Sequence, residues 1–212
     1  MISLTPLVEG YRRFLTSRYK QHAGLYENLS STGQSPSIMV IACCDSRVDP
    51  VTIFDAAPGE LFVVRNVANL VPPYELTGDL DDTGAAVEFA VKGLGVGHIL
   101  VMGHAQCGGV KAFLQDVFDP SLETNYILNW MSIMKPARAE VLRQAPHCEP
   151  EELQRMTEFS AVRQSLKNLA TFSFVRDRLE QGVPALHGAY FGIASGELLA
   201  LDPKNGRFEQ VS

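Results

Sequence analysis

Three short apolar runs limit most strongly what this chain can fold into. They span residues 37–43, 61–67 and 98–102 and are rich in valine and isoleucine. Uninterrupted apolar runs of this length are typical of strands that are buried on both faces of a parallel sheet. Helical patterns separate the runs, and strands that alternate with helices predict a mainly parallel sheet with crossover helices.

The end of the chain predicts a different strand pairing. Residues 189–193 and 198–201 are apolar, and between them lies Ser195-Gly196, a pair that suits a tight turn. We therefore expect a β-hairpin near the C-terminus.

The start of the chain predicts a helix. Thr5 resembles an N-cap, and Pro6 suits the first helical position. The apolar residues that follow fall on one helical face: Leu7, Tyr11, Phe14 and Leu15.

Further helices and loops follow from the spacing of apolar residues and from proline. Residues 30–37 are rich in serine, glycine and proline and predict a loop. Asp82 suits the cap of a helix, and 126–143 and 151–179 predict longer helices, the first of them broken at Lys135-Pro136. No long linker or repeat interrupts the chain, so we expect one domain over residues 1–212.

Composition excludes several classes of function. The chain has 212 residues, of which 46% are hydrophobic and 20% charged, as in ordinary globular proteins. The formal net charge of −6 disfavours nucleic acid as a partner, because phosphate binding needs a basic face. No apolar run approaches the roughly 20 residues that span a bilayer, and no export signal is visible, so we expect a cytoplasmic protein without membrane contact.

Potential metal ligands stand where two of the predicted strands end. Cys43 closes the first run, and His104 and Cys107 follow the third. Loops beyond the carboxyl ends of parallel strands converge on one crevice, so two thiolates and one imidazole can meet there. Three protein ligands with an open fourth position are typical of catalytic zinc sites. A buried cysteine that packs as a small apolar residue and a histidine that only donates a hydrogen bond are the alternatives. We interpret Cys44 and Cys148 as packing residues.

Asp45 and Arg47 lie beside the first of these cysteines. Alternation along an extended chain puts them on the same side, where a carboxylate and a guanidinium form a bidentate pair. Such a pair keeps Asp45 ionised and able to accept a hydrogen bond from a reacting water. Two alternatives stay open: Asp45 binds the metal as a fourth ligand, or the pair is a structural salt bridge.

Together these residues resemble a known family. Cys43-x-Asp45-Ser46-Arg47 with His104-x-x-Cys107-Gly108-Gly109 is similar to the signature of the β class of carbonic anhydrases. Further segments that are similar to family motifs lie at 33–36, 58–69, 83–90, 165–169 and 186–188. The resemblance begins near Gln34 and reaches the C-terminal hairpin.

The resemblance implies a function and a set of site residues. It implies zinc-dependent, reversible hydration of carbon dioxide to bicarbonate and a proton, with one zinc per chain. The implied metal ligands are Cys43, His104 and Cys107, and the implied catalytic dyad is Asp45–Arg47. The implied substrate-binding groups are the Gln34 amide, the Gly108 N–H and the apolar side chains of Phe62, Val67 and Phe89, part of this apolar wall coming from a neighbouring subunit.

The resemblance also implies a fold, a subtype and an assembly. The fold is α/β, with a central mixed, mainly parallel sheet, flanking helices, an antiparallel edge and an N-terminal helical arm (1–32) that packs on a partner subunit. The minimum unit is a homodimer. A second subtype binds inhibitory bicarbonate through a Trp, an Arg and a Tyr, where this chain has Val40, Arg65 and Phe191. One match of three places the chain with the plant-type subtype, whose site is open.

Two rival functions use the same residues. The zinc scaffold is also compatible with hydrolysis of carbon disulfide or carbonyl sulfide, which differ in the pocket they require. A non-catalytic zinc or thiol-redox module would tolerate loss of Asp45 or Arg47, and both residues are present. His98 and His187 are candidate proton relays, with packed or surface roles as the alternative.

Overall fold

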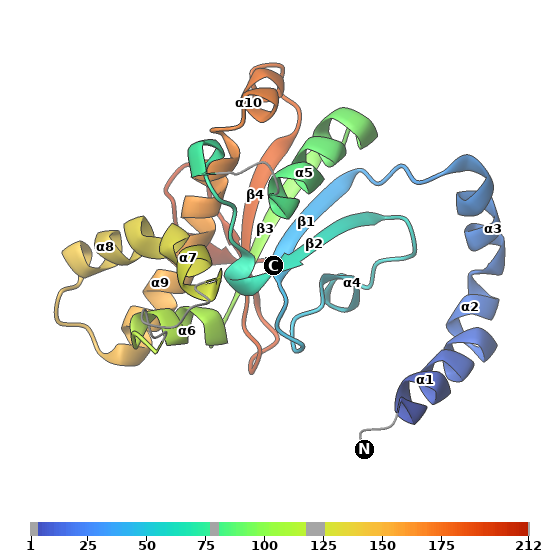
Figure 1. Cartoon of the computed structure of the whole chain (residues 1–212), viewed down its shortest axis with the longest axis horizontal. Helices are drawn as coiled ribbons and strands as arrows, with labels where there is room; N and C mark the ends of the chain where they lie inside the picture. Colours follow the sequence, from blue (N-terminus) through green and yellow to red (C-terminus); the bar gives the residue numbers. More distant parts are fainter. Residues whose placement is uncertain (1–3, 77–80, 118–125, 212) are drawn as a thin grey trace.

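Six strands form one sheet in the order β2-β1-β3-β4-β5-β6 in the computed structural model, which describes residues 4–76, 81–117 and 126–211 (Figure 1). The strands are β1 (Ile38–Cys43), β2 (Leu61–Asn66), β3 (His98–His104), β4 (Ala185–Phe191), β5 (Leu198–Leu201) and β6 (Phe208–Gln210). The first four are parallel, whereas β5 pairs antiparallel with both β4 and β6. The expected mixed, mainly parallel sheet with an antiparallel edge is confirmed, and the three apolar runs are β1, β2 and β3.

The register brings the carboxyl ends of the parallel strands to one edge of the sheet. Cys43, the last residue of β1, pairs with Asn66, the last residue of β2. His104, the last residue of β3, pairs with Phe191, the last residue of β4. Polar side chains that follow these strands therefore gather at one end of the molecule.

The helices fall into an N-terminal group and several crossovers. They are α1 (Thr5–Thr16), α2 (Arg18–Gln21), α3 (Ala23–Thr32), α4 (Pro50–Ile53), α5 (Asp82–Glu88), α6 (Gly108–Leu114), α7 (Tyr126–Met131), α8 (Lys135–Gln144), α9 (Pro150–Leu169) and α10 (Ser173–Leu179). Short 3₁₀ helices are η1 (Val67–Asn69), η2 (Tyr74–Leu76) and η4 (Ser132–Met134), and η3 (Phe89–Leu94) is a π-helix that continues α5. Among the residues described, no helix has both the length and the hydropathy that crossing a bilayer requires.

Apolar packing occurs on both faces of the sheet and at its carboxyl end. Met39, Ile41 and Ile99 point to one face and pack against α5, α9 and α10. Val40 and Met102 point to the other face, where Ile53 and Phe54, at the end of α4, pack against them. A third cluster joins η1, α6, α7 and η4 around Cys43 and Cys107. Full burial of a large aliphatic side chain stabilises a fold by about 1.5–3 kcal/mol, so these clusters hold the ends of β1 and β3 in place.

The N-terminal helices extend away from the sheet as an arm (Figure 1). No residue of α1, α2 or α3 is buried. The apolar face predicted for the first helix is present but open, with Leu7 71% and Tyr11 59% exposed.

Several predicted boundaries were wrong by one residue or one turn. Leu4, not Thr5, is the N-cap of α1, and Thr5 and Pro6 occupy the first two helical positions, which proline tolerates because their N–H groups have no helical partner. The predicted loop at 30–37 begins only at Gly33, since the hydroxyl groups of Ser31 and Thr32 bond back to the Asn28 carbonyl and continue α3.

Two further corrections concern the later helices. Asp81, not Asp82, caps α5, because Asp81 has extended backbone and its carboxylate accepts the Gly84 N–H at 2.8 Å. The helix predicted at 151–179 is two helices, since Phe172 leaves helical conformation to enter the core at 3% exposure. The predicted break at Lys135-Pro136 and the hairpin at Ser195-Gly196 are confirmed. β6 was not predicted.

Candidate metal centre

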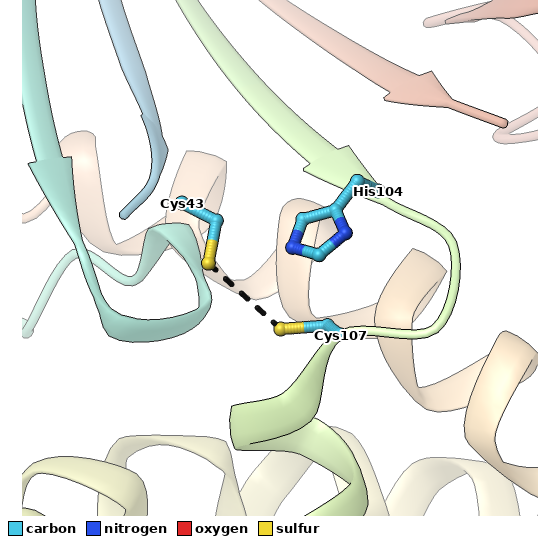
Figure 2. Close-up of side chains that lie close together, drawn as sticks. All are labelled: Cys43, His104 and Cys107. Carbon is cyan, nitrogen blue, oxygen red and sulfur yellow. Dashed lines mark hydrogen bonds between the residues drawn. The ribbon is translucent and has the colours of Figure 1, made fainter. Parts of the chain in front are cut away.

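Three potential ligands meet at the carboxyl end of the sheet (Figure 2). Cys43 is the last residue of β1, His104 the last of β3, and Cys107 the N-cap of α6. Their ligand atoms all lie within 4.8 Å of one another, and the Sγ atoms of the two cysteines are 4.0 Å apart. All three residues are at most 4% exposed.

One ring nitrogen of the buried His104 forms no hydrogen bond with the residues that the structure describes. His104 Nδ1 lies 2.9 Å from the Ala105 carbonyl oxygen, which can only accept, so Nδ1 carries the proton. Nε2 is then a buried acceptor, and it has no hydrogen-bond partner in the part of the chain that the structure describes. Unpaired buried polar atoms are rare in native proteins. A metal ion bound at Nε2 accounts for this one, and the two sulfurs beside it are ligands that zinc prefers.

A hydrogen bond joins the Sγ atoms of Cys43 and Cys107. The hydrogen bond from the Cys107 thiol lowers the pKa of Cys43, and this bond raises the pKa of Cys107. A divalent cation removes the need for that bond, because both sulfurs bind a metal as thiolates.

Arg47 holds Asp45 at two oxygen atoms. Arg47 Nε donates to Oδ1 at 2.9 Å and Nη2 to Oδ2 at 2.7 Å, and the Arg47 backbone N–H also donates to Oδ1. These bonds to Arg47 lower the pKa of Asp45 far below its usual range. The carboxylate therefore stays ionised and fixed beside the ligands, and it can accept a further hydrogen bond.

Arg65 fixes the same segment from β2. Its Nε donates to the Cys43 carbonyl at 2.9 Å and its Nη2 to the Asp45 carbonyl at 2.7 Å, and it forms a longer ion pair with Asp49. The sequence predicted Arg65 only as a bicarbonate ligand of the second subtype, and these contacts with backbone carbonyls were not predicted. The partners are backbone carbonyls, which leave no trace in a sequence pattern.

Two predicted substrate-binding residues lie near the candidate ligands. Gly108 is the exposed first residue of α6, directly after Cys107, so its N–H lies at a helix N-terminus. Val67 follows β2, and its Cγ1 packs so tightly on Gly109 that a Cβ there would lie 2.7 Å away. The Val67 carbonyl accepts the Trp130 indole N–H.

Three other predicted residues lie toward the opposite end of the sheet. Gln34 is exposed and precedes β1, next to Ser35, which lines a hollow at the amino end of β2. Phe62 is the second residue of β2 and contacts Phe89 with ring centroids 5.9 Å apart. β1 spans about 17 Å at the usual rise per residue, so Gln34 lies far from Cys43 of its own chain.

The candidate proton relays lie toward that same end. His98 is the first residue of β3, and its Nδ1 lies 3.1 Å from Nε2 of His187 on β4. β3 separates His98 from His104 by about 20 Å. Within one chain the pair is therefore remote from the candidate ligands.

A buried polar group behind Cys107 was also missed. Glu158 on α9 is 3% exposed, and its carboxylate accepts the Cys107 backbone N–H at 2.9 Å. It also accepts hydrogen bonds from Gln154 and from the Tyr190 hydroxyl. Glu158 is 51 residues beyond Cys107, and a single glutamate in a helix carries no sequence signal of such a contact.

Comparison with known proteins gives a consistent result. Residues 38–198 match the family model described as carbonic anhydrase. The chain is 38% identical over 199 residues to beta carbonic anhydrase 3 of Arabidopsis thaliana, with 92% of this chain and 76% of that protein covered. The solved structure of the beta-carbonic anhydrase CcaA superposes with a TM-score of 0.92 at 35% identity, covering 98% of this chain and 99% of that one. A structure of two tetrameric beta-carbonic anhydrases from Sordaria macrospora gives a TM-score of 0.80 at 27% identity, covering 93% and 95%.

Proposed function

The chain belongs to the carbonic anhydrase family, in its β class, and we propose that Cys43, His104 and Cys107 bind the zinc ion with which it hydrates carbon dioxide. The reaction is the reversible conversion of carbon dioxide and water to bicarbonate and a proton, a lyase activity. The observation that carries the site assignment is the buried, unpaired His104 Nε2 beside two sulfur atoms.

The residues around the ligands then have separate tasks. Zinc lowers the pKa of a water ligand to about 7 in carbonic anhydrases with three histidine ligands, and two thiolates donate more charge than two imidazoles. Asp45 accepts a hydrogen bond from the attacking water and orients it, while Arg47 keeps this carboxylate ionised. The Gly108 N–H stabilises a developing substrate oxygen, as a preorganised donor does, and Val67 supplies apolar wall.

A neighbouring subunit completes the pocket in this proposal. Gln34, Phe62 and Phe89 lie too far along the sheet to reach the zinc of their own chain, and Phe89 is 52% exposed. An exposed phenylalanine that packs on Phe62, and an exposed amide before β1, are side chains that a second chain can use. We therefore assign all three to the partner's site, which makes a homodimer the smallest complete unit. The tetrameric relatives support a homo-oligomer.

The N-terminal arm (1–32) packs on that partner. No residue is buried in the three helices of the arm, and the apolar side chains of Leu7 and Leu15 are 71% and 38% exposed. Burial of these apolar side chains against a second copy of the chain would stabilise the dimer. Residues 1–212 then act as one catalytic domain with an arm for assembly.

The site belongs to the open subtype. Arg47 holds both carboxylate oxygens of Asp45, which keeps Asp45 off the metal. Val40 is fully buried, and Arg65 is occupied by the Cys43 and Asp45 carbonyls, so neither is free to bind bicarbonate. Activity should fall gradually at low pH, and a steep loss that bicarbonate enhances would contradict this assignment.

Metal-binding thiols also suit a reducing compartment. With sulfur atoms 4.0 Å apart, Cys43 and Cys107 are close enough to be oxidised to a disulfide when no metal is bound. We therefore place the protein in the cytoplasm. The comparisons give no support to the sulfur-substrate hydrolase or the thiol-redox module, since the matched relatives are named carbonic anhydrase.

Metal analysis and stopped-flow carbon dioxide hydration test the proposal together. We expect close to one zinc per chain, and Cys107→Ser should lose most of both zinc and activity, because a neutral hydroxyl replaces a thiolate. Cys148→Ser is the matched control, since Cys148 lies on the loop between α8 and α9. Zinc-free but active wild-type protein, or a Cys107→Ser variant that keeps its zinc, would contradict the ligand assignment.

A further inference from the structure

One peptide group connects the candidate zinc ligands to the catalytic dyad. The carbonyl oxygen of Gln106 accepts a hydrogen bond from Arg47 Nη2 at 3.2 Å. The N–H of the next residue, Cys107, donates to Glu158 Oε1 at 2.9 Å. These two groups belong to the same planar peptide and point in opposite directions. Any rotation of this peptide therefore disturbs Arg47 on one side and Cys107 on the other.

The backbone at this peptide does not hold its orientation by itself. Gln106 has a φ of 55°, in the left-handed region that a residue with a Cβ rarely adopts. Such conformations persist only where surrounding contacts fix them. Arg47 is an exposed side chain, so the buried contact with Glu158 is the firmer of the two.

Glu158 is itself held rigidly. Its Oε1 also accepts Gln154 Nε2 at 2.9 Å, and its Oε2 accepts the Tyr190 hydroxyl at 2.7 Å. Gln154 Nε2 further reaches the Cys107 carbonyl at 3.4 Å. Glu158 and Tyr190 are 3% and 5% exposed. A buried carboxylate with three donors is a fixed acceptor, and α9 provides its rigid support.

We propose that Glu158 is a positioning residue for the hydration reaction: through the Gln106–Cys107 peptide it orients both the Cys107 thiolate toward zinc and the Arg47 guanidinium toward Asp45. This inference rests on the proposed zinc site. It adds a residue that touches neither metal nor substrate and that acts on both through one backbone group.

Two substitutions of Glu158 separate positioning from bulk. Glu158→Leu keeps the approximate volume but leaves the Cys107 N–H without an acceptor. Glu158→Gln keeps one oxygen for that N–H and turns its amide toward the Tyr190 hydroxyl, which can accept. We expect Glu158→Leu to release zinc to a chelator about tenfold faster or more and to lower kcat about tenfold, as loss of an outer partner of a metal ligand does. Glu158→Gln should restore both to within about threefold of wild type.

The visible absorption spectrum of the cobalt(II)-substituted protein reports on the metal site, and a loss of thermal stability alone does not change it. The visible bands of a cobalt site with two thiolates report the geometry of the sulfur ligands, so Glu158→Leu should shift them and Glu158→Gln should not. Thr157→Val is the matched control. Thr157 is a buried neighbour on α9 whose hydroxyl donates to the Leu153 carbonyl of the same helix. It should leave the cobalt bands and zinc release unchanged, even where its thermal stability falls.

Each outcome decides the inference. If Glu158→Leu does not fold, Gln154→Leu replaces it, since Gln154 is only partly buried and bonds both Glu158 and Cys107. The Gln154→Leu variant should release zinc several-fold faster than wild type. Wild-type cobalt bands and zinc release in Glu158→Leu or its replacement overturn the inference, as does an equal effect of Thr157→Val. Wild-type protein that binds no zinc refutes the proposed site instead, so the two failures are distinguishable.

Discussion

Arg47 forms more hydrogen bonds than an ion pair with Asp45 alone would need. It bonds both oxygens of Asp45 and the carbonyl of Gln106. Lysine cannot reproduce this pattern, because an ammonium group lacks the planar fork of a guanidinium. The contacts imply that Arg47 keeps Asp45 away from the metal as well as ionised.

Loss of Arg47 should therefore close the site. In Arg47→Ala the freed Asp45 carboxylate should bind the zinc as a fourth ligand, and activity should fall at least about 100-fold, on the scale of losing a key catalytic donor, with zinc retained. A crystal structure near neutral pH and metal analysis measure both effects. Arg47→Lys is the control and should lose less activity. An Arg47→Ala enzyme with near wild-type turnover, or with Asp45 still off the metal, would refute this role.

Residue types and spacing suggested the candidate ligands and the dyad, and the resemblance to the β class of carbonic anhydrases then assigned them. Cys43, His104 and Cys107 stand at strand ends, and Asp45 and Arg47 are two residues apart. Glu158 and Arg65 could not be predicted in this way. Each acts on a backbone group that is distant in sequence, and only the folded chain shows which peptide a side chain meets.

The contact between η1 and α6 fixes the position of Cys107, the second candidate cysteine ligand. α6 begins at Gly108, and a Cβ on Gly109 would lie 2.7 Å from Val67 Cγ1 and 3.5 Å from the Ala68 Cβ. A branched side chain cannot move aside easily, so the close approach needs glycine.

Gly109→Ala should therefore push α6 away from η1. Overpacking of this kind typically costs about 1–3 kcal/mol, and the shift should also move Cys107. We expect a lower Tm in calorimetry and faster zinc release. At Gly108 a Cβ would meet nothing within 4 Å, so the Tm of Gly108→Ala should be unchanged. Equal Tm values for the two variants would contradict the packing argument.

β3 and β4 place two histidines side by side at their amino ends. Burial lowers the pKa of His187, and the nearby charge of His98 lowers it further. The unfolded chain, with an ordinary histidine pKa of about 6.5, then binds a proton more readily than the folded one. The free energy of unfolding is therefore unaffected by His187 above a pH of about 6.5. It decreases as the pH falls from there toward the lower pKa of His187 in the folded chain.

His187→Gln should reduce this acid sensitivity. The drop in Tm between pH 8 and pH 5 should be smaller in the variant than in wild type, because the group whose protonation opposes folding is gone. His147→Gln, at an exposed position after α8, should keep the wild-type drop. An undiminished drop in His187→Gln would show that the pair does not contribute.

The elements that sequence predicted best are those whose composition alone identifies them. β1, β2 and β3 are continuous apolar runs, and all three were found within one or two residues of their ends. Caps were misplaced by one residue where two candidates stand together, as with Asp81 and Asp82. β6 has three residues with a charged centre, Glu209, and depends on pairing with β5 rather than on its own pattern.

In the homodimer that we propose, each catalytic site takes residues from two ends of the sheet. Gln34, Phe62 and Phe89 lie toward one end, and the candidate zinc ligands lie at the other. If the amino end of one sheet contacts the carboxyl end of its partner's sheet, a two-fold axis repeats that contact and completes both sites. The family resemblance implied that part of the apolar wall comes from the neighbouring subunit. Because β1 separates Gln34 from Cys43 of its own chain, we propose that Gln34 also serves the neighbouring subunit's site.

Subunit complementation tests the sharing. Gln34→Ala should lower kcat/KM about tenfold or more through loss of one donor, without loss of zinc, and Cys107→Ser should be inactive. Chains of the two variants, unfolded and refolded together, should regain roughly one quarter of wild-type activity, since half of the dimers are mixed and each mixed dimer has one complete site. Mixing the folded variants without exchange is the control. No recovery on refolding together would place Gln34 in its own chain's site.

If Gln34 serves the partner's pocket, as we propose, β1 connects two catalytic sites of the dimer. The strand carries Cys43 at one end and leads into Gln34 at the other, so it belongs to two catalytic centres. In the proposed dimer its six residues would help to set the distance between the two metal sites. Insertions or deletions in β1 would misalign both centres at once. Dilution that separates the subunits would likewise silence both, which makes activity per chain a measure of assembly.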